Sequence, residues 1–592
     1  MRATIVILLL IYGLLTDHQG LYPQNGQSST FSAMPQERMY VHYNTSLLFV
    51  GEYLYYKAYV LNEKATKLST LSKVAYVELV NKEMESIFKH KLFLENSTGQ
   101  SDFFIPADMP SGHYKLIGYT QWMRNGNKEN FFQGDISIIN PYQSAQSEVL
   151  PKRGLDSIFN DNDEKQVSSK VLVQNEHSEP LFGLTLDKTR YLKREKVVLG
   201  LRKGNAGSLE GNYSLSIRKI DTIAVPSKVS AIGFTRIKHK TGSKDTSSDF
   251  WFLPELRGEL ISGKVLANEQ NLANKDMNVV ISIPEEEGFQ LKVATSDSLG
   301  NFIVNLDKKY TGEKAHVQVL SDKRAKYSVT LDKTIPLNYP EMEYRGITIT
   351  PSMEEMIVER SVHNQIENGY FSVKPDSLAP LPAIFPIKKE IMTTYNLDDH
   401  TRFSTIRETL VEVVDQVWTK RIGQNQSLFQ ILPYQYDFQL MDFPPLVLMD
   451  GIPIQDHAQL AEYNARDVQH ISFLRDKYVV GPKIFQGVLN FETIDHDYVP
   501  YYMGSHGLFV DIVPPEPFKK YYQQKYDGTD TNADQLLDFR YQLLWEPNLK
   551  VNKRDVSVEF YTSDLEGDFE ITLEGFANDG TPVTLTKTFN VK

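Results

Sequence analysis

Tyr43-Asn-Thr-Ser-Leu-Leu-Phe-Val-Gly-Glu-Tyr-Leu-Tyr-Tyr56 decides the fold, because the chain restarts a similar pattern at a constant offset of 143 residues. The second copy is Leu186-Asp-Lys-Thr-Arg-Tyr-Leu-Lys-Arg-Glu-Lys-Val-Val-Leu199, which places Glu52 on Glu195. The first copy runs into an alternation of apolar and polar residues as far as Val60, the period of a strand with one buried face. Likeness at a fixed offset is typical of tandem modules, so we interpret the two stretches as a repeated β module.

The rest of the first module reads as short strands separated by turns. Val74–Val80 alternates again, and Pro110-Ser-Gly112 marks a hairpin before a strand at Tyr114–Thr120. Strands at this spacing, without a helical pattern between them, indicate an antiparallel sandwich. Strand patterns of the same kind recur at Gly263–Leu266, Asn278–Ser282, Asn301–Leu306, Val556–Tyr561, Phe569–Glu574 and Val583–Asn590.

The pattern changes near residue 400. Apolar residues recur at helical spacing from Phe403 to Val417, which predicts an amphipathic helix. A buried strand at Pro445–Met449, a short helix at Ala458–Tyr463 and a strand at Val468–Leu474 follow. This segment differs from the sandwiches around it and should form a separate α/β domain.

Composition and charge exclude several classes of function. The 592 residues carry a formal net charge of −12, whereas nucleic-acid-binding proteins concentrate basic residues, so we expect no nucleic-acid partner. The many aromatic residues, 32 Tyr and 31 Phe, favour β structure. The absence of cysteine excludes disulfides, thiolate catalysis and an acylated lipoprotein N-terminus.

The N-terminus predicts export. Arg2 precedes the apolar run Ile5–Leu15, which has the length of a signal-peptide core and is shorter than a membrane span. We interpret residues 1–20 as a signal peptide, with an uncleaved anchor as the alternative. Export without disulfides is typical of a bacterial envelope, so we expect the mature chain to be peripheral to a membrane.

The first module resembles the second macroglobulin-like domain of bacterial alpha-macroglobulin relatives. The resemblance is carried by Phe49-Val-Gly-Glu-Tyr-Leu-Tyr-Tyr-Lys-Ala-Tyr59 and Pro110-Ser-Gly-His-Tyr-Lys-Leu-Ile-Gly-Tyr-Thr-Gln-Trp-Met123. The motif residues it singles out are Gly51, Glu52, Gly112, Tyr114 and Trp122. Residues 539–564 look like a later sandwich of that family, and residues 255–320 resemble a carboxypeptidase-regulatory-like sandwich.

A second resemblance is to the plug domain of TonB-dependent outer-membrane receptors. It is carried by Leu446-Val-Leu-Met-Asp-Gly-Ile-Pro453, Asp467–Asp476 and Gly487-Val-Leu-Asn-Phe-Glu-Thr493. Its motif residues are Asp450, Gly451, Arg475, Gly481 and Gly487; the first two would make the turn after a buried strand and the last would begin the final plug strand. Only 99 residues follow Thr493, too few for a receptor barrel of about 22 strands. The resemblance therefore implies a plug-like domain without its barrel, in an envelope protein of Bacteroidetes type.

These patterns together predict a mainly β chain of tandem macroglobulin or immunoglobulin-like sandwiches with one small α/β domain. The expected division is a signal peptide 1–20, a macroglobulin-like sandwich 36–145, a linker 146–178, a second sandwich 179–254, a carboxypeptidase-regulatory-like sandwich 255–333, an irregular connection 334–398, a plug-like domain 399–495 and a C-terminal macroglobulin-like sandwich 496–592.

Candidate chemical sites are weak. The Cys–Gln thioester of alpha-macroglobulins is impossible without cysteine, and Gly504-Ser-His-Gly507 lacks the first glycine of a nucleophile elbow. Asp495-His-Asp497 with His506 resembles a metal site but is more often a surface turn. Two acidic stretches, 160–165 and 527–534, lack the glycine of a calcium loop and are better interpreted as solvated. We expect no catalytic, cofactor or metal site.

The leading hypothesis is a non-enzymatic envelope interaction protein, an accessory or scaffold of outer-membrane transport or assembly. Its partner would be a protein, such as an outer-membrane β-barrel or a surface lipoprotein, reached from the periplasmic face or at the cell surface. The alternative is a thioester-free macroglobulin relative that binds or inhibits proteases, with a cleavable segment at 334–380 or 515–535. A hydrolase with a site assembled between domains stays open but has no motif in its favour.

Overall fold

The computed structural model divides the chain into two compact units. The residues it describes are 34–144, 146, 148–150, 182–203, 210–240, 251–269, 272–380, 386–387, 389–423, 427–434, 443–499, 507–526, 528, 535–552 and 555–592. Unit 1 comprises Met1–Leu256, Asn338–Leu378 and Phe518–Lys592, and unit 2 comprises Arg257–Leu337 and Ala379–Pro517. The architecture is mainly β, as predicted, and consists of tandem sandwiches. Within the described ranges, no helix combines the length and apolar character that crossing a bilayer requires.

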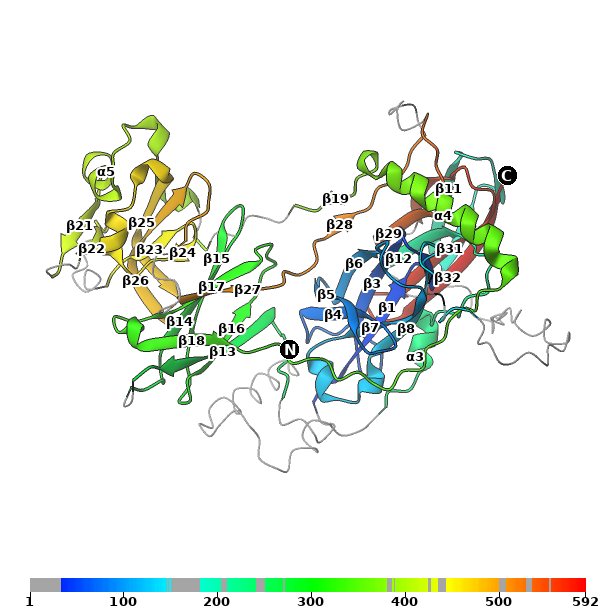
Figure 1. Cartoon of the computed structure of the whole chain (residues 1–592), viewed down its shortest axis with the longest axis horizontal. Coiled ribbons are helices and arrows are strands. Elements are labelled where there is room, and N and C mark those ends of the chain that lie inside the picture. Colours follow the sequence, from blue (N-terminus) through cyan, green and yellow to red (C-terminus); the bar gives the residue numbers. More distant parts are fainter. Residues whose placement is uncertain are drawn as a thin grey trace. The chain divides into compact units, whose positions relative to one another are not determined.

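Module 1 is a sandwich of a three-stranded sheet, β1-β3-β6, on a five-stranded sheet, β2-β8-β7-β4-β5 (Figure 1). Its core is rich in tyrosine, and Tyr40, Tyr56, Tyr59 and Tyr119 are fully buried. Two short 3-10 helices lie between its last two strands. The elements are β1 (Glu37–Tyr43), β2 (Leu47–Phe49), β3 (Tyr53–Asn62), β4 (Val74–Val80), β5 (Ser86–Phe93), β6 (Thr98–Phe104), β7 (Gly112–Tyr119), η1 (Trp122–Asn125), η2 (Lys128–Asn130) and β8 (Phe132–Ile139).

Module 2 is also one sandwich, but its strands come from two distant parts of the chain. The sheets are β9-β11-β30 and β10-β32-β31-β12-β29, and they share one apolar core. The expected separate sandwiches at 179–254 and 496–592 are therefore wrong, because each half supplies only part of both sheets. The strands are β9 (Phe182–Leu186), β10 (Arg190–Tyr191), β11 (Lys196–Lys203), β12 (Gly211–Lys219), β29 (Gln542–Val551), β30 (Asp555–Tyr561), β31 (Gly567–Phe576) and β32 (Pro582–Val591).

The two modules share one topology. When β9–β12 are matched to β1–β4 and β29–β32 to β5–β8, the strand orders of both sheets coincide. The parallel pair of β2 with β8 has its counterpart in the parallel pair of β10 with β32. The starts of β3 and β11, Tyr53 and Lys196, differ by the offset of 143 seen in the sequence. Residues 220–541 are thus an insertion between two neighbouring strands of module 2.

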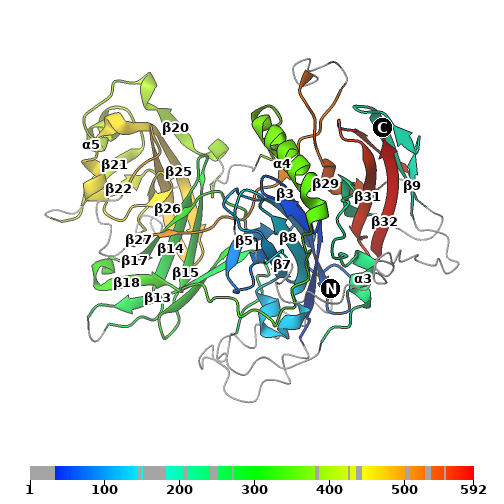
Figure 2. The ribbon, with the colours of Figure 1, turned by 45° about the vertical axis from the view of Figure 1, so that its right-hand side comes forward.

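Part of the insertion folds back onto module 1 and belongs to unit 1. A segment of extended chain, residues 338–350, which we call the strap, bonds to module 1 through Tyr339 Oη to Glu78 at 2.6 Å and Ile349 N to Val149 O at 2.7 Å. A 16-residue helix, α4, follows it, so the expected irregular connection at 334–398 is wrong for this stretch (Figure 2). The elements here are α3 (Ala231–Arg236), η5 (Pro351–Met353), α4 (Glu354–Gly369), η6 (Phe371–Val373) and the paired strands β19 (Ser377–Leu378) and β28 (Lys519–Lys520).

Unit 2 contains a third sandwich with the sheets β16-β13-β18 and β15-β14-β17-β27. Its last strand, β27, pairs with β17 although it follows the α/β domain in sequence. The expected assignment of this strand to the C-terminal sandwich is therefore wrong. The elements are β13 (Glu259–Ala267), β14 (Asn278–Pro284), β15 (Phe289–Thr295), β16 (Asn301–Leu306), β17 (Lys314–Leu320), η4 (Arg324–Lys326), β18 (Tyr327–Leu331) and β27 (Gly507–Asp511).

The α/β domain is inserted between β18 and β27. Its mixed sheet, β20-β25-β26-β23-β24, is covered on one face by α5, α6 and the hairpin β21–β22. The other face packs partly on the third sandwich through Phe289 and Leu291. The elements are η7 (Lys389–Ile391), β20 (Thr393–Asn396), η8 (Leu397–Asp399), α5 (Ile406–Glu412), β21 (Val417–Arg421), β22 (Ser427–Ile431), β23 (Leu446–Met449), β24 (Ile452–Pro453), α6 (His457–Ala461), η10 (Ala465–Asp467), β25 (Val468–Val480) and β26 (Lys483–Thr493).

Two expectations for this domain need correction. The predicted helix from Phe403 to Val417 is only seven residues long, because Thr405 caps its start and Val417 already belongs to a strand. The domain also begins before residue 399, since β20 is the edge strand that pairs with β25. Helical spacing marked four buried positions correctly, Ile406, Leu410, Val414 and Val417, but it did not locate the ends of the helix.

Candidate functional site

The turn between β2 and β3 is the centre of a buried polar cluster of module 1. Gly51 has a φ of +86°, a conformation that favours glycine. Glu52 accepts a hydrogen bond from Phe49 N at 3.1 Å, which closes the turn. In module 2, Leu192 N donates to Glu195 Oε2 at 2.6 Å in the same way, at the position predicted by the repeat.

In module 1 the carboxylate of this turn holds helix α4. Arg360 on α4 is fully buried and donates from Nε and Nη2 to the two Glu52 oxygens, each at 2.8 Å. Its Nη1 donates to Asp221 at 2.5 Å, and Arg218 Nη2 lies 3.7 Å from Glu52. We call Glu52, Arg218, Asp221 and Arg360 the first ion-pair cluster. It ties α4 to both modules, because Glu52 belongs to module 1 and Asp221 lies just after β12 of module 2.

Charge, rather than solvent, stabilises the ionised groups of this cluster. Burial alone would raise the pKa of Glu52, but Arg360 and Arg218 outweigh it and hold that pKa below its ordinary value. Burial lowers the pKa of Arg218, and neighbouring Arg360 adds to the effect. A buried pair of this kind is costly to break from one side, since the remaining charge loses its partner.

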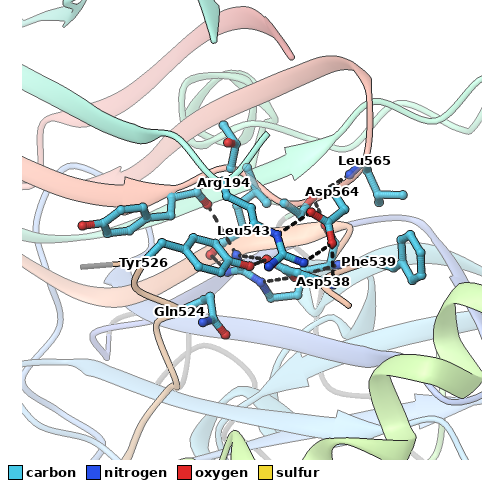
Figure 3. Close-up of polar contacts among 12 residues, drawn as sticks. Arg194, Gln524, Tyr526, Asp538, Phe539, Leu543, Asp564 and Leu565 are labelled. Carbon is cyan, nitrogen blue, oxygen red and sulfur yellow. Dashed lines mark hydrogen bonds and ion pairs between the residues drawn. The ribbon is translucent and has the colours of Figure 1, made fainter. Parts of the chain in front are cut away.

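A second ion-pair cluster lies in module 2, where the chain returns to β29 (Figure 3). We define it as Arg194, Tyr526, Asp538, Arg540 and Asp564. Arg194 donates from Nε and Nη2 to the two oxygens of Asp564, each at 2.6 Å.

The returning segment is held by the rest of this cluster. Arg540 binds Asp538 with both Nε, at 2.7 Å, and Nη2, at 2.6 Å, and Tyr526 Oη donates to Asp538 at 2.6 Å. The backbone N–H of Asp538 donates to Asp564 at 2.9 Å, which joins the two carboxylates into one network. Burial opposes ionisation of Asp538, but Arg540 holds its pKa below the ordinary value. Both clusters thus fix inserted segments onto the sandwiches.

Glu574 is a buried carboxylate between the two modules. Its Oε2 accepts from Ala231 N at 2.8 Å, Thr584 Oγ1 at 2.9 Å and Tyr40 Oη at 3.1 Å. Burial raises the pKa of Glu574 to about 7, and these hydrogen bonds only partly oppose the shift. Burial also lowers the pKa of the nearby Lys228 to about 8.

The remaining macroglobulin-motif residues have local structural contacts. Gly112 is the first residue of β7. Tyr114 Oη donates to Pro110 O at 2.8 Å, which fixes the hairpin. Trp122 Nε1 donates to Pro35 O at 2.8 Å. These residues lie in module 1 but, unlike Glu52, take no part in the two clusters.

The plug-motif residues mark turns of the α/β sheet. Asp450 and Gly451 have φ values of +47° and +76° and form the two-residue turn between β23 and β24, as expected. Asp450 also accepts from Thr493 N at 2.8 Å, and so ties this turn to the end of β26. Gly481, with a φ of +54°, lies in the turn between β25 and β26.

Gly487 has a different place from the expected one. It lies inside β26, which starts at Lys483, instead of beginning the strand. A side chain there would bring Cβ to 2.4 Å from Leu474 O, and the pairing of β25 with β26 shifts register beside it. The glycine therefore lies opposite a bulge in β25, and its lack of a side chain leaves room for Leu474 O.

Arg475 contacts an exposed tyrosine near one end of the β21–β22 hairpin. Its Nε donates to Leu432 O at 2.6 Å and its guanidinium lies 4.1 Å from the centre of the Tyr434 ring. Tyr434 is 61% exposed. Trp418, 37% exposed, lies next to Val417, which pairs with Ile431 at the same end of the hairpin. We call Trp418, Tyr434 and Arg475 the hairpin surface.

The weak chemical candidates do not converge. His496 Nδ1 lies 3.7 Å from Asp450, and among the described residues no group of three potential ligands is placed to hold a metal ion. His506, Gly504 and most of the 527–534 stretch lie outside the described residues, as does 160–165. A serine–histidine pair not found from the sequence, Ser214 Oγ and His42 Nδ1 at 2.6 Å, is buried between the modules. Burial places this pair in the core, away from any substrate.

Sequence reasoning missed Arg360 and both clusters. The only available signal was Glu52 itself, a carboxylate inside an otherwise aromatic strand motif. Its partner lies 308 residues later in a stretch without a strand pattern. Arg475 was found through the resemblance, whereas its contact with Tyr434 was not.

Comparisons with known proteins give structural neighbours only. No family model and no curated protein matches the chain. Among solved structures, the match to Salmonella alpha-2-macroglobulin reacted with methylamine covers 94% of this chain and 39% of that chain, at 9% identity and a TM-score of 0.23. The match to Escherichia coli alpha-2-macroglobulin activated by porcine elastase covers 94% of this chain and 44% of that chain, at 8% identity and a TM-score of 0.23. The match to dimeric latent PorU from Porphyromonas gingivalis covers 51% of this chain and 33% of that chain, at 11% identity and a TM-score of 0.14. The chain spans about two fifths of the length of the alpha-2-macroglobulins, and likenesses at these TM-scores carry no argument about function.

Proposed function

We propose that the chain is a non-enzymatic interaction protein of a bacterial cell envelope, in which the ion-paired modules of unit 1 form a rigid base and the α/β domain binds a protein partner. The observation that carries this proposal is the hairpin surface. It places Trp, Tyr and Arg, the residue types most enriched in binding hot spots, on one exposed end of a small domain.

The geometry of the hairpin surface favours binding because part of it is already ordered. Arg475 is held by the carbonyls of Leu432, at 2.6 Å, and Pro433, at 3.1 Å, while it stacks on Tyr434. Side chains fixed before binding lose less conformational entropy in the complex. A partner with an acidic group beside an apolar patch would match the charge of Arg475 and the ring of Trp418.

The partner class follows from the resemblance to a receptor plug. A plug-like domain in an exported chain is proposed to contact an outer-membrane β-barrel or a surface lipoprotein, from the periplasmic face or at the cell surface. The function of the whole chain would then be that of an accessory or scaffold in outer-membrane transport or assembly.

The test is capture of such a partner by the full chain from solubilised outer membranes. We expect a barrel protein or lipoprotein to be retained, and Trp418→Ala and Arg475→Ala to reduce retention at least tenfold. Leu299→Ala is the control, because Leu299 is 51% exposed in the third sandwich, outside the hairpin surface. Retention of neither class of partner, or equal retention by all variants, would reject the proposal.

A second candidate function is binding or inhibition of proteases by a thioester-free macroglobulin-like chain. The strap favours it, because it is extended and its Arg345 side chain is 68% exposed. The adjoining α4 is held by the first ion-pair cluster, so within 334–380 the strap is the better cleavable segment. Trypsin should cut first at Arg345 and its activity on large substrates should then fall. Cleavage elsewhere without a change in protease activity would eliminate this candidate.

A further inference from the structure

The face of the α/β sheet that is turned away from α5 and α6 changes from apolar to polar across three rows of residues. Leu446, Val488 and Leu474 form an apolar row that packs on the third sandwich. Thr394, Ser472, Asn490 and Leu448 are cross-strand neighbours in the next row. The third row is Asn396, His470 and Glu492.

A small cavity lies where the apolar and polar rows meet. It holds about 20 Å³, close to the size of one water molecule. Phe289, Ile387, Met392 and Leu448 form its apolar wall, and the polar wall comes from Thr394, Ser472, Asn490 and Glu492.

The polar wall presents oxygen atoms. Asn490 is 7% exposed, and its Oδ1 has no hydrogen-bond partner among the described residues. Its Nδ2 donates to Glu492 Oε1 at 3.2 Å, which orients the amide so that Oδ1 stays available as an acceptor. The hydroxyls of Thr394 and Ser472 lie 3.1 Å apart beside it. A buried acceptor without a donor is costly, so a ligand that donates hydrogen bonds would be stabilised there.

We propose that this cavity is a binding site for a primary alkylammonium group. An ammonium head is about as large as the cavity, donates three hydrogen bonds and accepts none, and its charge complements the Glu492 carboxylate. The apolar wall of Phe289, Ile387 and Met392 would contact the methylene stem. Either a lysine side chain of a protein or a free amine supplies this chemistry. The site does not depend on the proposed function, because the hairpin surface lies on the opposite face of the sheet.

The test is a ligand-observed NMR titration of the full chain with butylammonium, with n-butanol as the uncharged probe and a Gly-Gly-Lys-Gly-Gly peptide as the protein-like probe. We expect saturable binding of butylammonium and at least tenfold weaker binding of butanol. Binding of the peptide as tightly as butylammonium assigns the site to protein lysines, and binding of butylammonium alone assigns it to free amines.

The variants separate a built site from surface attraction. Glu492→Gln keeps the shape of the side chain and should weaken butylammonium binding about tenfold or more, and Asn490→Leu should abolish it. Glu269→Gln, an exposed carboxylate of the third sandwich, should bind as the unchanged protein does. Unchanged thermal unfolding of Glu492→Gln shows that the variant is folded. Absence of saturable binding, equal affinity for butanol, or full affinity in Glu492→Gln would overturn the proposal and leave a water molecule as the occupant.

Discussion

Replacement of Arg360 by Met should release α4 from the β2–β3 turn of module 1. The variant keeps an apolar stem of similar length but removes the two 2.8 Å bonds to Glu52 and the 2.5 Å bond to Asp221. Removing one partner of a buried ion pair costs about 3–5 kcal/mol. Glu52 keeps the Phe49 N–H and the more distant Arg218, so we expect the lower end of this range, about 3 kcal/mol.

Hydrogen exchange of the α4 amides measures this loss directly, because local opening sets their protection. A loss of about 3 kcal/mol corresponds to roughly a hundredfold faster exchange in residues 354–369. Glu355→Gln, an exposed position in the first turn of the same helix, is the matched control and should leave exchange unchanged. The double variant Arg360→Met with Glu52→Gln should recover much of the protection, since it leaves no charged Glu52 behind. Exchange that changes less than about threefold in Arg360→Met, or a double variant no better protected than the single one, would refute the reasoning.

Three further predictions concern other parts of the chain. The pKa of Glu574 is raised from 4.5 to about 7 in the folded state, so between these pH values the folded protein binds more protons than the unfolded chain. The free energy of unfolding should therefore fall by about 3 kcal/mol as pH rises from about 4.5 to 7. Chemical unfolding at several pH values should show this slope in the unchanged protein and its loss in Glu574→Gln. Gly346→Ala would place Cβ 1.8 Å from the His113 ring and should detach the strap at a cost of about 1–3 kcal/mol. Proteolysis of the strap should then be faster. The double variant Gly346→Ala with His113→Ala should restore resistance of the strap to proteolysis. Asp450→Ala loses the hydrogen bonds to Thr493 and leaves a non-glycine residue at a φ of +47°. The free energy of unfolding of the α/β domain should therefore fall by about 2–4 kcal/mol, and Asp450→Asn should lower it less. Equal losses of stability in the two variants would contradict the role of φ.

The sequence could predict what depends on local periodicity. Alternation located β3, β4 and β7 of module 1, and the offset of 143 residues located the restart of the same module at β9–β11. The resemblance to a receptor plug implied the turn at Asp450-Gly451, and both residues have the positive φ that this turn requires. The strands and the turn are each fixed by neighbours within about ten residues, the range over which strand and turn patterns act.

Pairing between distant strands was beyond this kind of reasoning. Residues 220–541 separate β12 from β29, yet the two strands are neighbours in one sheet. The entropic cost of closing a loop grows only logarithmically with its length, so a long insertion is tolerated. Such an insertion leaves no pattern in the residues on either side of it. The same applies to Arg360, whose burial contradicts the ordinary exposure of arginine and depends on two carboxylates far away in sequence.

The repeat also explains why Arg360 of α4 binds the turn of module 1 and no arginine of α4 binds the matching turn of module 2. Phe49 in the module 1 turn is buried and lies 4.3 Å beneath the Arg360 guanidinium, whereas its counterpart Leu192 is 66% exposed. The carboxylate of Glu195, the counterpart of Glu52, pairs with Lys188 from its own module at the surface. The Glu195 carboxylate is already paired and hydrated at the surface, so binding a buried arginine would add little stability. Burial of both charged groups would still cost their desolvation. The two copies therefore keep the same backbone turn, and the side chains around the shared glutamate decide which copy accepts a helix.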